Sequence, residues 1–426
     1  MEKQFSYIEI GKNGDPTPGF GNSPVIKSFA RLFFQLSQEG TAADCIKRVN
    51  ERGVFSLSHV AGFESVSACS GFIYDEVNFI GFNGAVTFYL VQDRSFCDGI
   101  FVPEHKLFIG RAASTVNRVR RVSESGLNIS IERDKPAGPP ASFYLSQSKP
   151  YHYFYDYFPV AHELMELVSN NCVSTTFEGA FLDVGSVYER EVSLLQDKRG
   201  IMFLEGYSVS LLRDKVMPRV KLKRSIKKFD SFLRERSSSL VTQALVNEFE
   251  HSKNVVWLGI SLRRPLIEQV YFINCFLTAC RQKLGSLWVL VDGFTSSAFP
   301  SEKSIITKST TSQFNSVLNE LELTGDRVTL LHGYDSISKI YLASKCKLFF
   351  SEAGTASLYP GRFCSKPGLT YGSEKKRYSR HENINGVYVD GARANISKTW
   401  ILDSIIIDKD LFHRELERLL LRLDSR

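Results

Sequence analysis

The sequence contains no long apolar run. No stretch of about 20 uncharged apolar residues occurs among its 426 residues, and this excludes a transmembrane helix. The opening segment Met1–Phe5 also lacks the apolar core of a secretory signal. From these two absences we expect a cytoplasmic protein, either free or peripheral to a membrane.

Metal-binding patterns are also missing. The eight cysteines are scattered without a Cys-x-x-Cys pair, and in a chain without a secretory signal we expect them to be reduced thiols. At Asp292, an Asp-x-Asp motif, which could hold a divalent ion on a diphosphate, is absent, since Asp292 is followed by Gly293 and provides a single carboxylate. The sequence therefore predicts chemistry without a metal or other cofactor, in which Arg, Lys and helix dipoles neutralise the leaving group.

Two common nucleotide-binding motifs are absent from the C-terminal run Gly325–Ser357. No Gly-Lys-Ser/Thr and no Gly-x-Gly-x-x-Gly occurs there, so the run is neither a Walker loop nor a dinucleotide fingerprint. Its pattern predicts a strand, a helix, a second strand, and a small-residue turn that opens another helix. Because a helix N-terminus presents free N–H groups and a positive dipole end, this turn is a candidate phosphate site.

The length and composition indicate a globular protein of more than one domain. A chain of 426 residues is too long for one ordinary core, and 43% of it is hydrophobic. We expect an N-terminal domain over residues 1–240 that is β-rich and then α/β. A Rossmann-like domain is expected over 241–400, followed by an amphipathic helix over 401–426.

Positive charge is concentrated in one segment. The net charge is +7, and eight cations lie between Arg213 and Lys228 with only Asp214 to oppose them. The segment predicts either an anion site for lipid headgroups or an acidic glycan, or a solvated helix or linker face. Nucleic acid is the weakest partner because no recognised binding motif accompanies the patch. The candidate residues for an anionic acceptor or membrane are Arg219, Lys221, Lys223 and Arg224.

The N-terminal half has mixed patterns. An amphipathic helix is predicted around Val25–Leu36, and β-type composition runs from Val77 to Gly110 with an Asn83-Gly84 turn. Residues 110–150 are polar and predict a loop. Further along, the pattern predicts a strand end at Phe181–Gly185, a helix at Val187–Leu195, and an interdomain boundary near 235–245.

Strands and helices alternate in the C-terminal half. The sequence predicts strands at Val255–Leu262, Leu287–Asp292 and Lys366–Gly372 besides those of the Gly325–Ser357 run, with helices at 266–280, 312–323 and 408–423. Such alternation is typical of an α/β Rossmann-like domain, whose ligands bind at the carboxyl ends of the strands. The last helix is amphipathic, and we expect it to pack back across the molecule.

Polar loops follow three of these strands. Arg263-Arg264 can bind a diphosphate as bidentate donors, although an exposed basic loop fits equally well. His332 can contact a phosphate or a base, or be a satisfied structural histidine. In the loop Ser351–Ser357, small residues allow close backbone approach, and tight helix–strand packing is the alternative. The predicted nucleotide-binding residues are Arg263, Arg264, His332, Glu352, Gly354, Thr355 and Ser357, with Glu382 as an acceptor for a ribose hydroxyl.

An aromatic cluster in the first half contains the candidate catalytic pair. His152 and Asp156 are four residues apart in the run Lys149–Glu163, so on a helix they would share one face. Such a pair can act as a general base oriented by a carboxylate, and the aromatic side chains between them can stack on sugar rings. The alternative is an aromatic core helix that carries one polar pair.

These motifs together resemble a glycosyltransferase with two Rossmann-like domains, the GT-B architecture, and most closely glycosyltransferase family 61. Asn78–Val86 resembles the β-rich opening of that family, and Tyr151–Pro159 is similar to its Tyr-His-(aromatic)-x-x-Asp-x-x-Pro signature. Ser336–Thr355 resembles its late helix–strand–loop. The family has His-Gly-Ala-Gly where this chain has Ser351-Glu352-Ala353-Gly354, and its Asn-Glu pair has no counterpart after Arg264.

The resemblance implies sugar transfer from a nucleotide-sugar to a glycan or lipid-linked glycan. It makes residues 241–400 the nucleotide-sugar donor domain, residues 1–240 the acceptor-side domain, and the predicted nucleotide-binding residues the donor-binding residues. It further implies bacterial capsule or lipopolysaccharide synthesis on the cytoplasmic face, with the chain peripheral on the inner membrane. The departures leave open a transferase for CMP-activated acidic sugars of the Kdo or sialyl type. They also leave open a non-catalytic glycan- or nucleotide-binding protein and a nucleotide-sugar epimerase.

Overall fold

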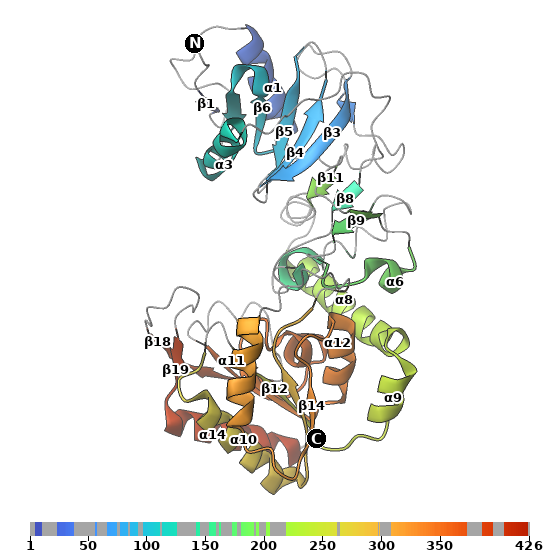
Figure 1. Ribbon diagram of the computed structural model, residues 1–426, viewed down its shortest axis with the longest axis vertical. Helices are drawn as coiled ribbons and strands as arrows, with labels where there is room; N and C mark the ends of the chain where they lie inside the picture. Colours follow the sequence, from blue (N-terminus) through green and yellow to red (C-terminus); the bar gives the residue numbers. More distant parts are fainter. Residues whose placement is uncertain are drawn as a thin grey trace. The chain divides into compact units, whose positions relative to one another are not determined.

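The computed structural model describes the parts of the chain that Figure 1 draws in colour. These are residues 5–10, 24–37, 56–57, 66–74, 77–83, 86–92, 97–110, 113–125, 142–144, 153–158, 162, 173–176, 180–190, 193–195, 202–204, 219–261, 265–296, 298, 308–372, 386–394 and 404–424. The chain divides into two compact units, each of which contains residues from both halves of the sequence. Unit 1 comprises residues 1–146, 156–179 and 188–226, and unit 2 comprises 147–155, 180–187 and 227–426. Domain limits at residues 240 and 400 remain predictions.

Unit 1 contains a seven-stranded sheet. Its strand order is β1-β7-β6-β5-β4-β3-β2, in which β1 is parallel to β7 and every other neighbour is antiparallel. This confirms the β-rich pattern of Val77–Gly110, because the hairpin partners there pair in sequence order. The strands are β1 (Ser6–Glu9), β2 (Ser56–Leu57), β3 (Val66–Tyr74), β4 (Val77–Phe82), β5 (Phe88–Gln92), β6 (Gly99–Val102) and β7 (Leu107–Gly110), with the 3₁₀ turn η1 (Pro103–His105) before β7.

Two helices cover opposite faces of this sheet. Helix α1 (Pro24–Leu36) packs with one cluster of buried side chains and confirms the predicted amphipathic helix. Helix α3 (Ala113–Glu124) packs on the other face through Val116, Val119 and Val122. The prediction of a loop throughout residues 110–150 is therefore wrong. The three valines recur every third residue, which places them on one helical face although the segment is otherwise polar.

A second sheet in unit 1 is fully parallel. It has the order β10-β9-β8-β11, so β8 is an inner strand that pairs with β9 on one side and with β11 on the other. This order is typical of small α/β domains with crossover connections. The strands are β8 (Ser142–Tyr144), β9 (Val173–Thr176), β10 (Ser193–Leu195) and β11 (Met202–Leu204).

Two local predictions between residues 180 and 195 are wrong. The helix α6 spans Val184–Tyr188, earlier than the predicted Val187–Leu195, and the end of that range forms β10 instead. Phe181–Gly185 is not a strand. Phe181 and Leu182 precede the helix, and Asp183 accepts hydrogen bonds from the amide and hydroxyl of Ser186 at the first turn.

The basic segment continues into a long helix. Helix α8 spans Arg219–Leu240, and after a short break α9 spans Gln243–Phe249. Ser237, Ser238 and Ser239, which fall within the predicted interdomain boundary, lie in α8, where each hydroxyl donates to the carbonyl three residues earlier. The predicted boundary near 235–245 therefore corresponds to the end of a helix and the capped start of the next, where Thr242 accepts from the amide of Leu245.

Unit 2 is built on a six-stranded parallel sheet. Its order is β14-β13-β12-β15-β16-β17, which in chain order is 3-2-1-4-5-6. This is the strand order of the Rossmann fold, and it confirms the predicted α/β class for the C-terminal half. The strands are β12 (Val255–Gly259), β13 (Trp288–Asp292), β14 (Arg327–Leu330), β15 (Leu348–Glu352), β16 (Gly368–Gly372) and β17 (Gly386–Asp390).

Helices cover both faces of the unit 2 sheet. Helices α10 (Gln269–Leu284), α11 (Lys308–Asn319) and α14 (Lys409–Asp424) share one buried cluster with the sheet. Helix α12 (Ser336–Lys345) and the π-helical turn η3 (Leu358–Phe363) lie on the other face, where Tyr359 contacts Trp257. A short antiparallel pair, β18 (Ala392–Ala394) and β19 (Ser404–Ile406), precedes α14.

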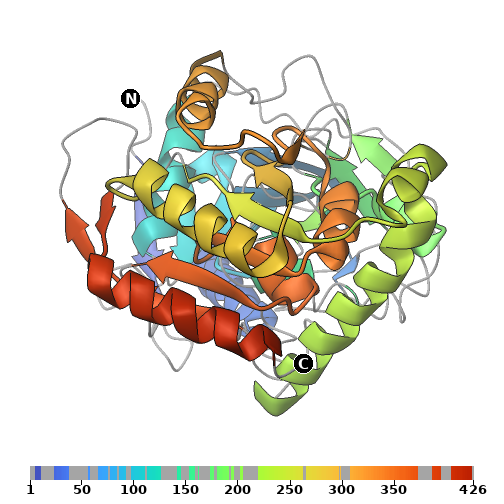
Figure 2. The ribbon, with the colours of Figure 1, turned by 90° about the horizontal axis from the view of Figure 1, so that it is seen from below.

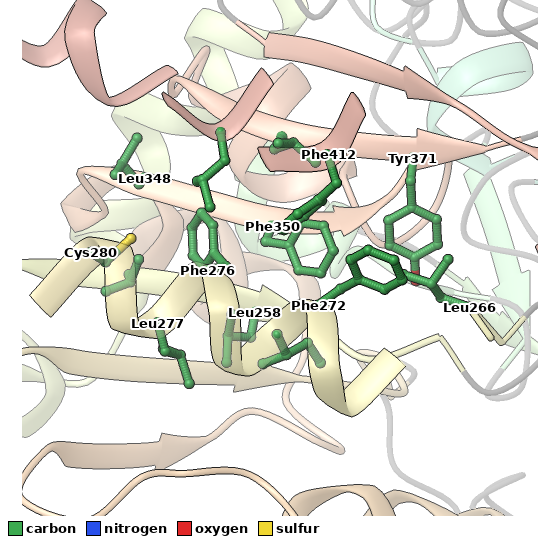
Figure 3. Packing of buried hydrophobic residues seen from close by; sticks show 14 of the residues in the cluster. Leu258, Leu266, Phe272, Phe276, Leu277, Cys280, Leu348, Phe350, Tyr371 and Phe412 are labelled. Atoms are coloured by element: carbon green, nitrogen blue, oxygen red, sulfur yellow. The ribbon is translucent and has the colours of Figure 1, made fainter. Parts of the chain in front are cut away.

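The C-terminal helix completes the core of its own sheet. Figure 2 shows α14, in red, running beside α10, in yellow, and Figure 3 shows Phe412 of α14 among Phe272 and Phe350. The ring of Phe412 lies 4.9 Å from Phe272 and 5.7 Å from Phe350. The helix therefore packs against the strands β16 and β17 that precede it, and the core of unit 2 includes it. Among the described residues, no helix is both long and apolar enough to cross a membrane.

Candidate functional site

The strand order of unit 2 defines a switch point between β12 and β15. Connections leave these two neighbouring strands in opposite directions, and ligands of open parallel sheets bind in the crevice that this produces at the carboxyl edge. Two polar side chains meet there: the Ser261 hydroxyl donates to Oε2 of Glu352 over 2.5 Å. Gly259 allows this close approach of β12 and β15, since a Cβ there would lie 2.6 Å from the Cβ of Ser351.

A wider polar cluster surrounds this contact. Gln269, in the first turn of α10, accepts hydrogen bonds from the Ser261 amide at 3.3 Å and from the Tyr371 hydroxyl at 3.4 Å. Burial, and then the charge of Glu352, raise the pKa of Tyr371, so its phenol stays protonated and donates. Ser261, Gln269 and Tyr371 are buried, whereas Glu352 is half-buried. The cluster therefore holds one carboxylate in a fixed position at the crevice.

The small-residue turn after β15 has an internal brace. Gly354 has φ +127°, a conformation that L side chains rarely adopt. Its amide donates to the Ser357 hydroxyl at 3.0 Å, and that hydroxyl donates to the Gly354 carbonyl at 3.2 Å. Ser357 is 8% exposed, while Thr355 is exposed at the tip of the turn. Ser357 thus holds the turn in shape, and Thr355 is the residue of the turn that a ligand can reach.

The segment after this turn differs from the prediction. A helix was expected to open there, but η3 is a buried π-helical turn of six residues. Ser365 follows with φ +49°, a left-handed conformation that ends a helical segment. Because so short an element has only a small dipole, it gives little reason to seat a phosphate here. The longer helix at the switch point is α10, which follows β12.

A buried ion pair occupies the end of β13. Nζ of Lys339 lies 2.5 Å from Oδ1 of Asp292, and it also donates to the carbonyl of Phe294 and the hydroxyl of Thr295. Burial raises the pKa of Asp292 against the pull of Lys339, and burial lowers the pKa of Lys339 against the pull of Asp292. Both side chains are at most 3% exposed. Asp292 is therefore committed to Lys339 and is not presented to a ligand.

Tyr359 extends this network to η3. Its hydroxyl donates to Thr295 Oγ1 at 3.1 Å and lies 3.1 Å from the hydroxyl of Ser336. Burial raises the pKa of Tyr359, which keeps the phenol neutral within the network. The network joins β13, α12 and η3 beneath the carboxyl edge and explains why this face of the sheet carries polar groups in its core.

His332, after β14, is fixed in one orientation. Its Nδ1 accepts the amide hydrogen of Phe294 at 3.1 Å, so Nε2 carries the proton in the neutral ring. The ring of Phe314 stacks on it with centroids 4.6 Å apart. Burial, and then the charge of Lys339, lower the pKa of His332. Because β13 lies between β14 and β12, the end of β14 that carries His332 is two strand spacings, about 10 Å, from β12.

The structure thus brings together Ser261, before the first predicted loop, and Glu352, in the third, and it places His332 of the second on a different strand. Ser261 directly precedes the loop of Arg263 and Arg264, and it touches Glu352. Arg263, Arg264, His152 and Glu382 lie outside the described residues. The backbone of Asp156 lies in the π-helical turn η2 (Tyr153–Tyr157). The first turns of α8 contain the backbone of the four cations Arg219, Lys221, Lys223 and Arg224. The side chains of these five residues also lie outside the described part of the structure. The functional roles of all these residues remain predictions.

Sequence reasoning missed Gln269, Tyr371 and Lys339. Lys339 had a visible signal, since it lies with Ser336, Ile340 and Ala343 on the apolar face of a predicted helix, where an unpaired lysine is unfavourable. A buried lysine needs an acidic partner, and Asp292 was a visible candidate because it stands at the end of a predicted buried strand. Gln269 and Tyr371 gave no such signal, because their contact depends on the pairing of β12, β15 and β16, which the sequence does not specify.

Comparison with known proteins gives no family. No protein-family model matches the sequence, and no curated protein matches it. Ten chains among solved structures match. One of them is a mutant of TarM from S. aureus in complex with fondaparinux, alpha-GlcNAc-glycerol and UDP, with 8% identity, a TM-score of 0.22, and 92% of this chain and 79% of TarM covered. A TM-score this low supports no argument about the fold or the ligand of this chain.

Proposed function

We propose that this protein is a glycosyltransferase that takes a sugar from a nucleotide-sugar and transfers it to a glycan or lipid-linked glycan. The observation that carries the proposal is the 3-2-1-4-5-6 sheet of unit 2, whose switch point is flanked by Ser261 and Glu352. The resemblance of three motifs to glycosyltransferase family 61 agrees with it. The proposed donor site is the crevice at the carboxyl ends of β12 and β15.

The charge of Glu352 decides which part of the donor lies beside it. A carboxylate repels a diphosphate but accepts hydrogen bonds from hydroxyl groups. We therefore assign Glu352, braced by Ser261, to hydroxyls of the ribose or of the transferred sugar. The phosphates then belong near the start of α10, where the preceding loop carries Arg263 and Arg264 and where helix N–H groups point outward.

The remaining predicted residues complete a working scheme. Thr355 is exposed on its turn and supplies a hydroxyl to the donor, whereas the Nε2–H of His332 is buried and is not presented to a ligand. His152, oriented by Asp156, removes the proton of the acceptor hydroxyl. Arg219, Lys221, Lys223 and Arg224 are assigned to binding an anionic acceptor or the inner membrane. No metal takes part in this scheme, because the arginines neutralise the leaving group.

Donor binding provides the test. We expect one of UDP, GDP or CMP to raise the thermal stability of the protein, since a ligand that binds only the native state stabilises it. Glu352→Gln should weaken the affinity for the matching nucleotide-sugar at least tenfold in calorimetry. Glu320→Gln, an exposed glutamate at the end of α11, is the matched control and should bind like the wild type. Equal binding by both variants would remove Glu352 from the site.

Turnover separates the candidate functions. In the presence of the preferred nucleotide-sugar and a panel of glycan acceptors, we expect transfer, and His152→Ala and Arg263→Ala should each lower the rate at least tenfold. Selective binding of CMP would point to a transferase for acidic sugars. Binding without any turnover would indicate a non-catalytic protein, and conversion of the donor without an acceptor would indicate an epimerase.

A further inference from the structure

One buried guanidinium connects three segments of unit 2. Arg362, in η3, places Nε 3.1 and 3.2 Å from the two carboxylate oxygens of Asp230, and Nη2 2.9 Å from Oδ1. Its Nη1 donates to the main-chain carbonyl of Phe154 over 2.7 Å. Arg362 is 7% exposed and Asp230 is 8% exposed, so all these bonds are made away from water.

The three segments are those that sequence patterns had marked for separate functions. Arg362 follows the small-residue turn after β15, Asp230 lies in the helix that begins with the basic segment, and Phe154 lies in η2 within the aromatic run Tyr151–Pro159. Aromatic contacts reinforce the junction. The guanidinium carbon lies 4.4 Å from the Tyr155 ring, and Phe154 meets Phe363 edge to face at 5.3 Å.

Stability alone does not account for this arrangement. Moving two charges out of water costs several kcal/mol per ion, so a buried ion pair is often no more stabilising than apolar residues of the same volume. Consistent with that cost, burial raises the pKa of Asp230 even though Arg362 opposes the shift. What apolar residues cannot supply is the directional bond to the Phe154 carbonyl. That bond fixes the main chain within a π-helical turn, a form of helix that is rare and frequently found at functional sites.

We propose that Arg362 is a positioning residue of the transferase: oriented by Asp230, it fixes the backbone of η2 through the Phe154 carbonyl. This inference rests on the proposed function. Phe154 stands two residues after His152 and two before Asp156, so the bond fixes the chain between the two members of the candidate catalytic pair. Arg362 itself touches neither donor nor acceptor. Its loss should therefore slow turnover and leave donor affinity unchanged.

The test uses a double variant, Asp230→Leu with Arg362→Met. Removing both charges leaves no uncompensated ion in the core, while the bond to Phe154 is lost. The matched control is Arg281→Met with Asp326→Leu, because Arg281 also binds an aspartate through two nitrogens and donates to a main-chain carbonyl, that of Glu322. We expect the first double variant to lose at least tenfold in kcat with a nucleotide-sugar Kd within twofold of wild type. The control should change kcat by less than twofold.

Arg362→Lys is the second variant, in case the double variant does not fold. Its ammonium keeps a charge opposite Asp230 but cannot reproduce the planar fork that reaches both Asp230 and Phe154. We expect kcat to fall at least fivefold, donor Kd to stay unchanged, and amide exchange of residues 153–158 to increase. Wild-type kcat in either folded variant, or parallel loss of kcat and donor binding, would overturn the positioning role. Absence of any transfer by the wild-type protein would instead overturn the proposed function, and the positioning role with it.

Discussion

The buried pair of Asp292 and Lys339 gives the sharpest stability prediction. Lys339→Met removes the only cation that contacts Asp292 among the described residues, and it leaves a carboxylate that is 3% exposed without its partner. Breaking a buried pair from one side typically costs about 3–5 kcal/mol. We expect a loss of that size in the free energy of unfolding at pH 7, measured by urea denaturation. Lys347→Met, an exposed lysine just after α12, should change it by less than about 0.5 kcal/mol.

The pH dependence of the loss identifies its cause. Without Lys339, the folded-state pKa of Asp292 rises further above its unfolded value of about 3.9. A group with a raised folded pKa contributes stability at low pH that is lost as the pH rises toward that pKa, by about 1.4 kcal/mol per pH unit. The deficit of Lys339→Met should therefore be smaller at pH 5 than at pH 8.

A double variant tests whether the loss of stability comes from the unpaired charge of Asp292. Asp292→Leu with Lys339→Met removes both charges, and its stability should return to within about 2 kcal/mol of wild type at every pH. If the double variant is as unstable as Lys339→Met, or if the deficit of the single variant does not shrink on acidification, the loss does not arise from an uncompensated Asp292. The reasoning about this network would then fail.

Two further variants test the core and the turn of unit 2. Phe412→Ala should lower the free energy of unfolding by about 3–5 kcal/mol, because the ring is fully buried against Phe272 and Phe350. Leu421→Ala is the control on the same helix: its side chain is 62% exposed, so stability should change by less than about 0.5 kcal/mol. Ser357→Ala should lower the free energy of unfolding by about 1–3 kcal/mol, because it leaves the Gly354 amide without its partner. Thr355→Ala, at the exposed tip of the turn, should leave stability unchanged but weaken donor binding. Equal stability of the two variants would contradict the role of Ser357 in bracing the turn.

The sequence predicted the fold of unit 2 well because its signals are local. Val255–Leu262 and Leu287–Asp292 are apolar runs of strand length separated by a helix-period segment, and this pattern is typical of a parallel sheet. The loop prediction over residues 110–150 failed because Val116, Val119 and Val122 are few among polar residues, so only their burial under the sheet shows a helix.

The candidate site was predictable only at the level of loops. Glu352, Gly354 and Thr355 stand at a strand end, which is visible in the sequence. The contacts of Glu352 with Ser261, and of Arg362 with Asp230 and Phe154, join residues 91, 132 and 208 positions apart. Such pairings are set by strand order and helix packing, so no spacing along the chain could reveal them.

Amide hydrogen exchange with and without the preferred nucleotide-sugar tests the central claim most directly, since it reports where on the chain the ligand binds. The proposed donor site predicts protection in peptides that cover the end of β12 with the start of α10, residues 259–272, and the end of β15 with its turn, residues 351–358. Strands β4 to β7 of unit 1 should show no change. Protection confined to unit 1, or none in either of the two predicted segments at saturating ligand, would contradict the assignment of the switch point as the donor site.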